Sequence, residues 1–227
     1  SNSLDSQETY HISYPSGAFT NTSGDVSYVG TAYTFGAKTS VPTFFVWGIQ
    51  EDYGQLGLNS RTNYSSPVQL PGSASFVGNK RGSGTFGILS RETGTLWVMG
   101  RQAAGSLGLN EGSGNHKSSP TQIPGTTWAT VTNPQIVVVA TKTDGTLWSW
   151  GQNEKGKLGL NNTTEYSSPV QVGGSTNWST TVGKLGSGQK HTLAIKTDGT
   201  LWSWGFNGEE GQLGHNNRTD YSSPTQI

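Results

Sequence analysis

One decapeptide occurs twice in this chain and sets the scale on which the chain can fold. The sequence Lys-Thr-Asp-Gly-Thr-Leu-Trp-Ser-Trp-Gly runs from Lys142 to Gly151 and again, without a change, from Lys196 to Gly205. Self-similarity at a regular spacing is typical of folds that stack one small unit. We therefore interpret the rest of the sequence as copies of this unit and the segments between them.

Each copy has the pattern of a β-hairpin. In the last copy, the apolar run His191–Ile195 and a second run, Leu201–Trp204, consist of strand-favouring residues. Between them, Asp198 can accept hydrogen bonds within a turn, and Gly199 can adopt the positive φ that side chains disfavour. The unit therefore predicts two antiparallel strands joined by a tight turn.

Two weaker copies precede the two strong ones, and the copies end at Gly48, Gly100, Gly151 and Gly205. Each is followed by a Gly-x-Leu-Gly element, an asparagine and a Ser-Ser-Pro sequence. The elements begin at Gly54, Gly105, Gly156 and Gly211, the asparagines are Asn59, Asn110, Asn161 and Asn216, and the prolines are Pro67, Pro120, Pro169 and Pro224. We assign the asparagines to turns, because asparagine tolerates a left-handed backbone. Several short strands in about fifty residues, without helical periodicity, predict the blade of a β-propeller.

This combination of motifs resembles the repeats of the regulator of chromosome condensation family, in its prokaryotic and phage-like form. The resemblance covers residues 25–227 as four tandem propeller repeats and leaves residues 1–24 as a non-repeat segment. It implies an all-β fold, a β-propeller of four-stranded blades. Members of the family usually have more blades than the four of this chain, so we expect the propeller to be open or completed by other chains.

The ends of the array raise two questions. An open array exposes sheet edges, which soluble proteins cover, so we consider closure as a four-bladed ring, completion by other chains, or a longer parent protein. We favour assembly, as a homo-oligomer or as part of a larger complex. Because the chain does not begin with Met, we expect that the protein has been processed or trimmed, or that the sequence is only part of a longer one. Residues 1–24 are either a flexible lead-in or, through the alternating run Tyr10–Tyr14, the donor of a strand that completes a blade.

Composition excludes several classes of partner. Fourteen basic and fourteen acidic residues cancel, so no long-range field attracts nucleic acid or an anionic membrane. There are no cysteines, which excludes disulfides and thiolate chemistry. No apolar run is long enough to insert into a membrane. We predict no nucleic-acid partner and no membrane insertion.

No residue pattern indicates catalysis. The histidines occupy different phases of the repeat and lack metal-ligand spacing; they are His11, His116, His191 and His215. We expect His191 to be a packed or rim histidine and His215 to replace a scaffold leucine. The sequence has no nucleophile elbow, phosphate loop or dinucleotide fingerprint. We predict that the chain is not an enzyme and has no catalytic residues, no metal and no cofactor.

The copies differ most between the hairpin glycine and the Gly-x-Leu-Gly element. Equivalent loops of a propeller gather on one face, so variable loops on a constant frame are candidates for a contact surface. The predicted partner-binding residues are Glu51, Asp52, Tyr53, Arg101, Gln102, Glu154, Lys155, Phe206, Glu209 and Glu210. The alternatives are that surface loops vary without binding anything, and that the adjacent carboxylates bind a cation; we favour a solvated loop over the cation.

For the core we predict stacked blades joined through Leu96, Leu147, Leu201, Trp150 and Trp204. For function, we predict a structural or interaction module that binds a protein or glycan partner, displayed on a virion as a fibre or decoration protein, or on a cell surface as a bacterial adhesin. The family resemblance implies an alternative, a regulatory protein resembling a nucleotide exchange factor for a small GTPase; zero net charge and the lack of a basic tail disfavour it. A third hypothesis, a carbohydrate-acting enzyme, is supported only by aromatic residues that we expect to be exposed.

Overall fold

In a computed structural model, which describes most of the chain, the residues form two compact units, Ser1–Val41 and Pro42–Ile227. In the first unit, β1 (Thr9–Ile12) pairs antiparallel with β2 (Tyr33–Gly36). The strand expected within Tyr10–Tyr14 is therefore present; its role in completing a blade stays a prediction. The described residues are 9–12, 33–36, 44–50, 52–71, 76–80, 86–91, 93–133, 136–208 and 210–227.

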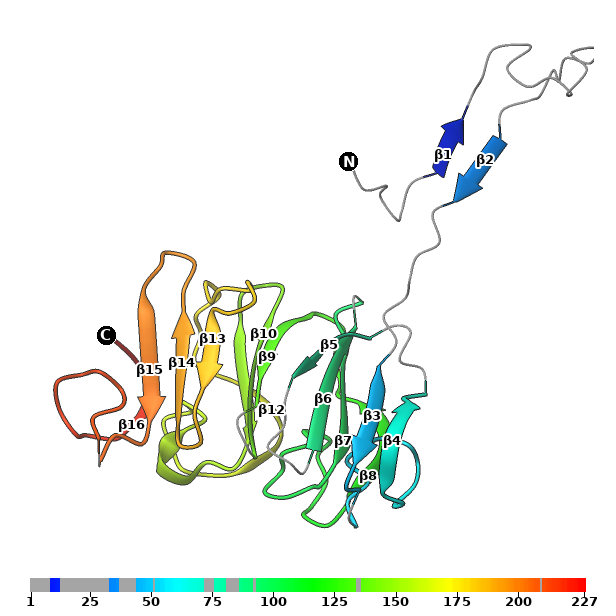
Figure 1. The fold of residues 1–227 in the computed structure, drawn as a ribbon. Helices are drawn as coiled ribbons and strands as arrows, with labels where there is room; N and C mark the ends of the chain where they lie inside the picture. Colours follow the sequence, from blue (N-terminus) through cyan, green and yellow to red (C-terminus); the bar gives the residue numbers. More distant parts are fainter. Residues whose placement is uncertain are drawn as a thin grey trace, which may run out of the picture. The chain divides into compact units, whose positions relative to one another are not determined.

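The second unit consists of antiparallel sheets that follow one another along the chain (Figure 1). Blade 1 is described as two strands, β3 (Phe45–Gly48) and β4 (Tyr64–Gln69). Blades 2, 3 and 4 have four strands each, with neighbouring strands adjacent in sequence. Blade 2 contains β5 (Phe76–Lys80), β6 (Phe86–Arg91), β7 (Leu96–Gly100) and β8 (Lys117–Gln122); blade 3 contains β9 (Trp128–Thr132), β10 (Val137–Lys142), β11 (Leu147–Gly151) and β12 (Tyr166–Gln171); blade 4 contains β13 (Leu185–Ser187), β14 (His191–Ile195), β15 (Leu201–Gly205) and β16 (Tyr221–Gln226).

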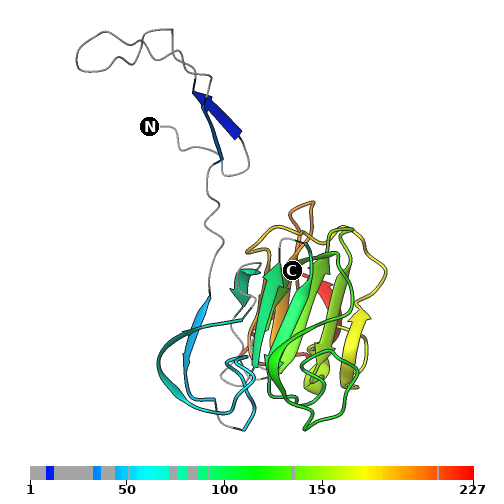
Figure 2. The ribbon, with the colours of Figure 1, turned by 90° about the vertical axis from the view of Figure 1, so that its right-hand side faces the viewer.

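The predicted all-β fold with four-stranded blades is confirmed. Blades 2, 3 and 4 stand side by side in chain order in Figure 1, and Figure 2 shows the same sheets from the side of blades 1 and 2. The described part of the chain contains no α-helix, and its one helical turn is the 3-10 turn η2 (Glu154–Gly156). The last sheet, like those of blades 2 and 3, has four strands, so the fourth repeat also forms a four-stranded blade.

The repeated decapeptide forms the predicted hairpins β10–β11 and β14–β15. In the first, Asp144 Oδ1 accepts hydrogen bonds from the backbone N–H and the hydroxyl of Thr146, at 3.0 and 2.6 Å. Thr146 Oγ1 in turn accepts one from Trp148 Nε1 at 2.8 Å. Gly145 has φ +78°, the conformation expected at its place in the turn. Consecutive hydrogen bonds from Trp148 to Thr146 and from Thr146 to Asp144 therefore explain the strict Asp-Gly-Thr-x-Trp spacing.

These turns make stability depend on pH. The side-chain and backbone hydrogen bonds from Thr146 and Thr200 lower the pKa of Asp144 and Asp198 below the ordinary aspartate value. A carboxyl with a lower pKa in the folded state stabilises the fold above its unfolded-state pKa, and this contribution is lost as pH falls through the folded-state pKa.

We therefore expect the double variant Asp144→Asn/Asp198→Asn to be less stable than the parent at neutral pH, with a difference that shrinks as pH falls and the two carboxyls become protonated. Urea unfolding over a series of pH values from neutral to acidic measures the difference. A gap that stays the same in acid would contradict the assignment of the effect to the ionised carboxylates.

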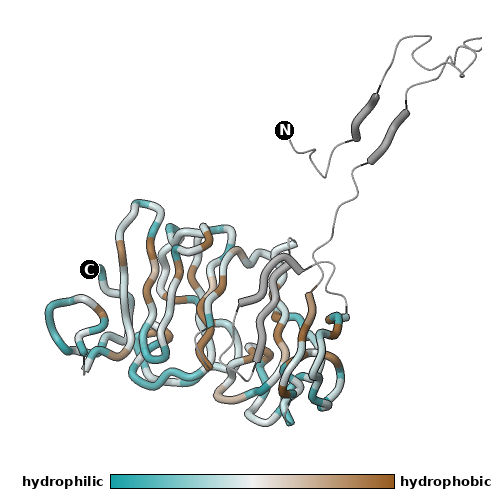
Figure 3. Tube along the Cα trace, in the orientation of Figure 1, coloured by the Kyte–Doolittle hydropathy of each residue, from teal (hydrophilic) through white to brown (hydrophobic). Residues whose placement is uncertain are grey.

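The core lies between consecutive blades. Trp150 of β11 is fully buried in a cluster with Leu96, Leu107 and Ile123 of blade 2. Its Nε1–H donates to the carbonyl of Ser106, also in blade 2, at 3.1 Å. Figure 3 shows apolar segments along strands of the blades and polar segments in many of the loops that connect them. Trp150, and Trp204 at the equivalent position of blade 4, therefore belong to the contact with the preceding blade.

One predicted core residue is an exception. Leu96 and Leu147 are buried, as predicted, but Leu201 is 36% exposed. The leucine side chains at this position pack against the following blade, and the described residues form no further blade after blade 4. The run Val137–Val139 is buried on both faces of its sheet.

Candidate functional site

The variable loops are held to their own blade by a buried amide side chain. The residues concerned are Gln50, Gln102, Asn153 and Asn207, all at most 1% exposed. Each side-chain oxygen accepts the backbone N–H of the leucine in the Gly-x-Leu-Gly element, with distances of 2.6 Å at Leu56 and 2.9 Å at Leu107, Leu158 and Leu213. A loop anchored in this way presents its remaining side chains in a defined arrangement.

The same loops are also held to the next blade. Asn110 N–H of blade 2 donates to the carbonyl of Ser167 in β12 at 2.7 Å. A methyl group on Gly105 would lie 2.5 Å from Ser167 Cα, so the backbones touch and only glycine fits. Equivalent hydrogen bonds join Asn59 to Ser118 and Asn161 to Ser222. All four repeated asparagines have positive φ, as predicted: Asn59, Asn110, Asn161 and Asn216.

These junctions place the variable loops together at one end of the blades, the lower end in Figure 1, while the Asp-Gly turns lie at the opposite end. We call this end the loop surface, defined by the described residues of 50–57, 101–116, 152–165 and 206–220. The predicted partner-binding residues lie in these segments. The structure describes all of them except Glu51 and Glu209, which lie outside the described residues.

Two predicted residues from neighbouring blades meet at the first junction. The guanidinium of Arg101, in blade 2, lies 5.2 Å from the ring centroid of Tyr53, in blade 1. The ring of His116 packs edge-on against the same tyrosine, with centroids 4.9 Å apart. Burial, and then the positive charges of Arg101 and Arg61, lower the pKa of His116. Its Nδ1 accepts the backbone N–H of Gln102 at 3.0 Å, so this neutral histidine is a structural part of the cluster.

A second cluster forms where blades 3 and 4 meet. Phe206 of blade 4 has Lys190 Nζ 4.7 Å and Lys155 Nζ 6.0 Å from its ring centroid. Lys155 belongs to blade 3 and also lies 3.9 Å from a carboxylate oxygen of Asp220 in blade 4. At both junctions an aromatic ring is therefore flanked by a cation from the neighbouring blade.

The remaining predicted residues divide into surface and interior. Asp52, Glu154 and Glu210 are exposed. Gln102 is 1% exposed, because its amide also donates to the carbonyl of Glu111 at 2.8 Å, so it shapes the loop and does not reach the surface. The sequence contained a signal for this role, since all four copies have an amide residue at this position.

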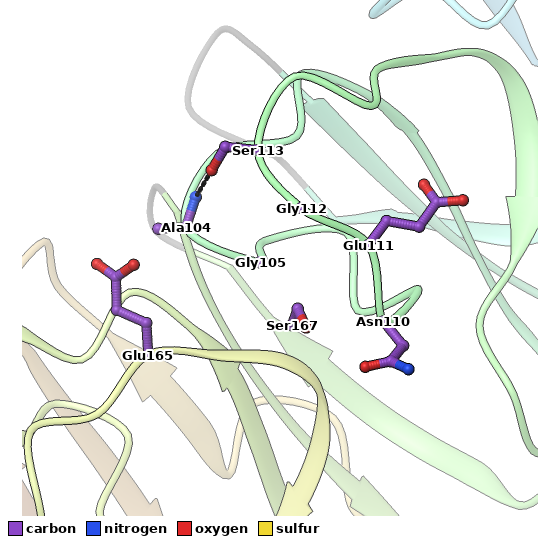
Figure 4. Close-up of a pocket in the computed structure, with 8 residues that line it drawn as sticks. All are labelled: Ala104, Gly105, Asn110, Glu111, Gly112, Ser113, Glu165 and Ser167. Carbon is purple, nitrogen blue, oxygen red and sulfur yellow. Dashed lines mark hydrogen bonds between the residues drawn. The ribbon is translucent and has the colours of Figure 1, made fainter.

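A shallow pocket opens on the loop surface between blades 2 and 3 (Figure 4). Its volume is about 260 Å³, and Glu111 and Glu165 contribute carboxylates from different blades. Glu111 is paired with Lys117 at 2.8 Å, and Ser113 Oγ accepts the Ala104 N–H at 3.2 Å. We did not predict these residues, because they follow the Gly-x-Leu-Gly element. Variation between copies after the repeated asparagine was the signal that could have indicated them.

The described residues include no group of three histidine, cysteine or acidic side chains that could hold a metal ion. They also include no helix with the length and apolar character needed to cross a membrane. What the loop surface does offer is aromatic faces, flanking cations and exposed carboxylates on anchored loops. This arrangement is suited to binding.

Comparison with known proteins identifies the repeats. The family model described as the regulator of chromosome condensation (RCC1) repeat matches residues 144–195 and 198–227. The chain contains RCC1-like repeats in these residues. Similar curated proteins include human Protein RCC2, 41% identical over 86 residues, which covers 37% of this chain and 16% of that protein. Another is the RCC1 domain-containing protein RUG3, mitochondrial, of Arabidopsis thaliana, 28% identical over 199 residues, covering 84% of this chain and 44% of that protein.

Solved structures share the fold of this RCC1-like protein. Human WBSCR16 matches with a TM-score of 0.63 and 23% identity, covering 81% of this chain and 46% of that chain. Prp20p of Saccharomyces cerevisiae matches with a TM-score of 0.63 and 18% identity, covering 81% and 45%. The chain therefore spans less than half the length of these proteins. The predicted family and propeller fold are confirmed, while its prokaryotic and phage-like form stays a prediction.

Proposed function

We propose that this RCC1-like protein is a non-enzymatic module that binds another protein through its loop surface. The observation that carries the proposal is the pair of clusters Tyr53–Arg101 and Lys155–Phe206, each assembled from two blades. Tyrosine and arginine are enriched among the few residues that contribute most to protein–protein binding. Because both loops of each cluster are anchored by buried amides, little order has to be gained on binding.

The choice of a protein as partner has two supports. The chain has no net charge, and the loop surface mixes cations with carboxylates, which does not favour a polyanion. The structure of Prp20p, which shares the fold, is described together with the binding of that protein to Gsp1p and histones. A glycan partner, which the sequence left open, has no comparable support.

The test compares proteins captured by the parent chain and by the double variant Tyr53→Ala/Phe206→Ala. We expect bound partners to be lost from the variant, because truncating a central aromatic contact costs about 2 kcal/mol or more, roughly a 30-fold loss of affinity. The control is Val182→Ala, at an exposed apolar residue outside the segments that define the loop surface. Equal capture by the parent and the double variant, with equal melting temperatures, would contradict the proposal.

A second candidate function is the regulatory one, nucleotide exchange on a small GTPase. The structural similarity to Prp20p, and the reported binding of that protein to Gsp1p, favour it. Nucleotide release from purified Gsp1p, with and without the chain, tests it directly. Display on a virion or a bacterial surface stays a prediction, because no described residue bears on it.

A further inference from the structure

Glu165 occupies a position of the repeat that serves the scaffold in the other three copies. There, the residue directly before the last strand of the blade accepts the backbone N–H of the buried amide residue that anchors the variable loop. The pairs are Asn63 with Gln50 at 2.8 Å, His116 with Gln102 at 3.0 Å, and Asp220 with Asn207 at 2.7 Å. A side chain at this position is therefore normally tied to its own loop.

In blade 3 this tie is missing, and the glutamate is exposed. The carboxylate of Glu165 forms neither a hydrogen bond nor an ion pair with any described residue. Its side chain instead lines the pocket between blades 2 and 3 (Figure 4). The fourth copy has thus exchanged an internal acceptor for a carboxylate that is free to contact a ligand.

The negative charge of Glu165 is not compensated within the pocket. The other carboxylate there, that of Glu111, is already paired, because both of its oxygens lie 2.8 Å from Lys117 Nζ. Burial lowers the pKa of Lys157, an effect that the charge of Glu165 partly offsets. Lys157 is only 5% exposed, however, and its Nζ donates to Gln152 Oε1 at 2.7 Å. A positively charged ligand is therefore favoured at Glu165.

Two uncharged acceptors line the same pocket from the two facing blades, Asn110 and Ser167. At the junction of blades 1 and 2, the equivalent side chains satisfy each other, since the hydroxyl of Ser118 donates to Asn59 Oδ1 at 3.3 Å. The side chains of Asn110 and Ser167 make no hydrogen bond to a described residue. Their oxygens can therefore accept hydrogen bonds from a ligand next to Glu165.

The size of the pocket limits what it can hold. Its volume of about 260 Å³ lies below the roughly 300–1,000 Å³ of sites for small molecules, and it is suited to one side chain of a larger partner. A guanidinium group presents five N–H donors in one plane and can pair with a carboxylate through two of them, whereas an ammonium group is a compact point charge. Several separate acceptors around one carboxylate therefore favour arginine.

We propose that the pocket receives an arginine side chain of the protein that binds the loop surface. The guanidinium pairs with the carboxylate of Glu165 and donates to the side-chain oxygens of Asn110 and Ser167. This inference rests on the proposed function, because the arginine is supplied by a protein partner. It adds the chemistry of that partner: a basic residue that enters between blades 2 and 3, flanked by contacts with the aromatic clusters at the two neighbouring junctions.

Disulfide tethering to the full chain tests the pocket without the partner. The chain has no cysteine, so Gly112→Cys introduces a single thiol at the pocket. This substitution is tolerable, because Gly112 does not have a positive φ and an added Cβ would lie 4.0 Å from the nearest atom. The variant is equilibrated with end-blocked peptides Cys-Gly-Arg, Cys-Gly-Lys or Cys-Gly-Gln under reversible thiol–disulfide exchange. Intact mass measures the fraction of chain that retains each peptide.

We expect the arginine peptide to be retained about fivefold more than the glutamine peptide, and more than the lysine peptide. Adding Glu165→Gln, which removes the charge and keeps the size of the side chain, should abolish this preference. The matched control is Glu154→Gln, at an exposed glutamate of the same blade that does not line the pocket; it should leave the preference intact.

Three results would overturn the proposal. The first is equal retention of the arginine and glutamine peptides, and the second is a preference that survives Glu165→Gln. The third is equal retention of arginine and lysine, which would show only a general attraction of positive charge. None of them bears on partner binding through the aromatic clusters, which is tested separately by capture with the Tyr53→Ala/Phe206→Ala variant.

Discussion

Replacing Gly156 with alanine is expected to destabilise the second unit by about 3 kcal/mol, because two penalties add. Gly156 has φ +71°, a conformation that costs a residue with a side chain free energy. The new methyl group would also lie 2.5 Å from Ser222 Cα in the next blade, and a backbone atom cannot move aside without shifting β16. Urea unfolding followed by circular dichroism measures the loss.

Substitutions at two other glycines separate the cost of the positive φ from the cost of the steric clash. Gly199 has φ +86° with open space around it, so Gly199→Ala should cost only about 1 kcal/mol. Gly174 has neither a positive φ nor a close neighbour, so Gly174→Ala should change stability by less than about 0.5 kcal/mol. If Gly156→Ala and Gly199→Ala cost the same, then the close approach of the blades contributes nothing.

The second large effect is expected at Trp204. Trp204→Ala should lower the free energy of unfolding by about 3–5 kcal/mol, since a fully buried ring is removed from between blades 3 and 4. The variant also leaves the carbonyl of Lys157 without the hydrogen bond from Nε1. Urea unfolding again provides the measurement, and Trp204→Phe separates the ring from the hydrogen bond.

Trp47 is the matched control, because it occupies the same position of the repeat and is exposed. Trp47→Ala should cost less than about 1 kcal/mol. Comparable losses at the two tryptophans would show that burial against a neighbouring blade does not determine their contribution.

The candidate site was only partly predictable. Variation between the copies indicated the loops that gather at one end, and it selected Tyr53, Arg101, Lys155 and Phe206. It could not indicate that Arg101 lies over Tyr53, because the two residues are far apart in sequence and meet only where one blade packs on the next. Sequence variation in the loops also selected Gln102 as a surface residue, although the amide residue that recurs at this position in all four copies was a signal for the buried anchoring role.

The sequence alone determined what is local or repeated: the hairpins, the positive φ of the repeated asparagines and the spacing of the blades. These follow from hydrogen bonds and steric limits within a few residues, as in the turn at Asp144 and Gly145. Only the tertiary structure decided which copy of a residue is buried. Trp47 and Trp204 precede equivalent glycines in the same kind of strand, but burial requires a neighbouring surface: Trp204 is buried against blade 3, whereas Trp47 is 58% exposed.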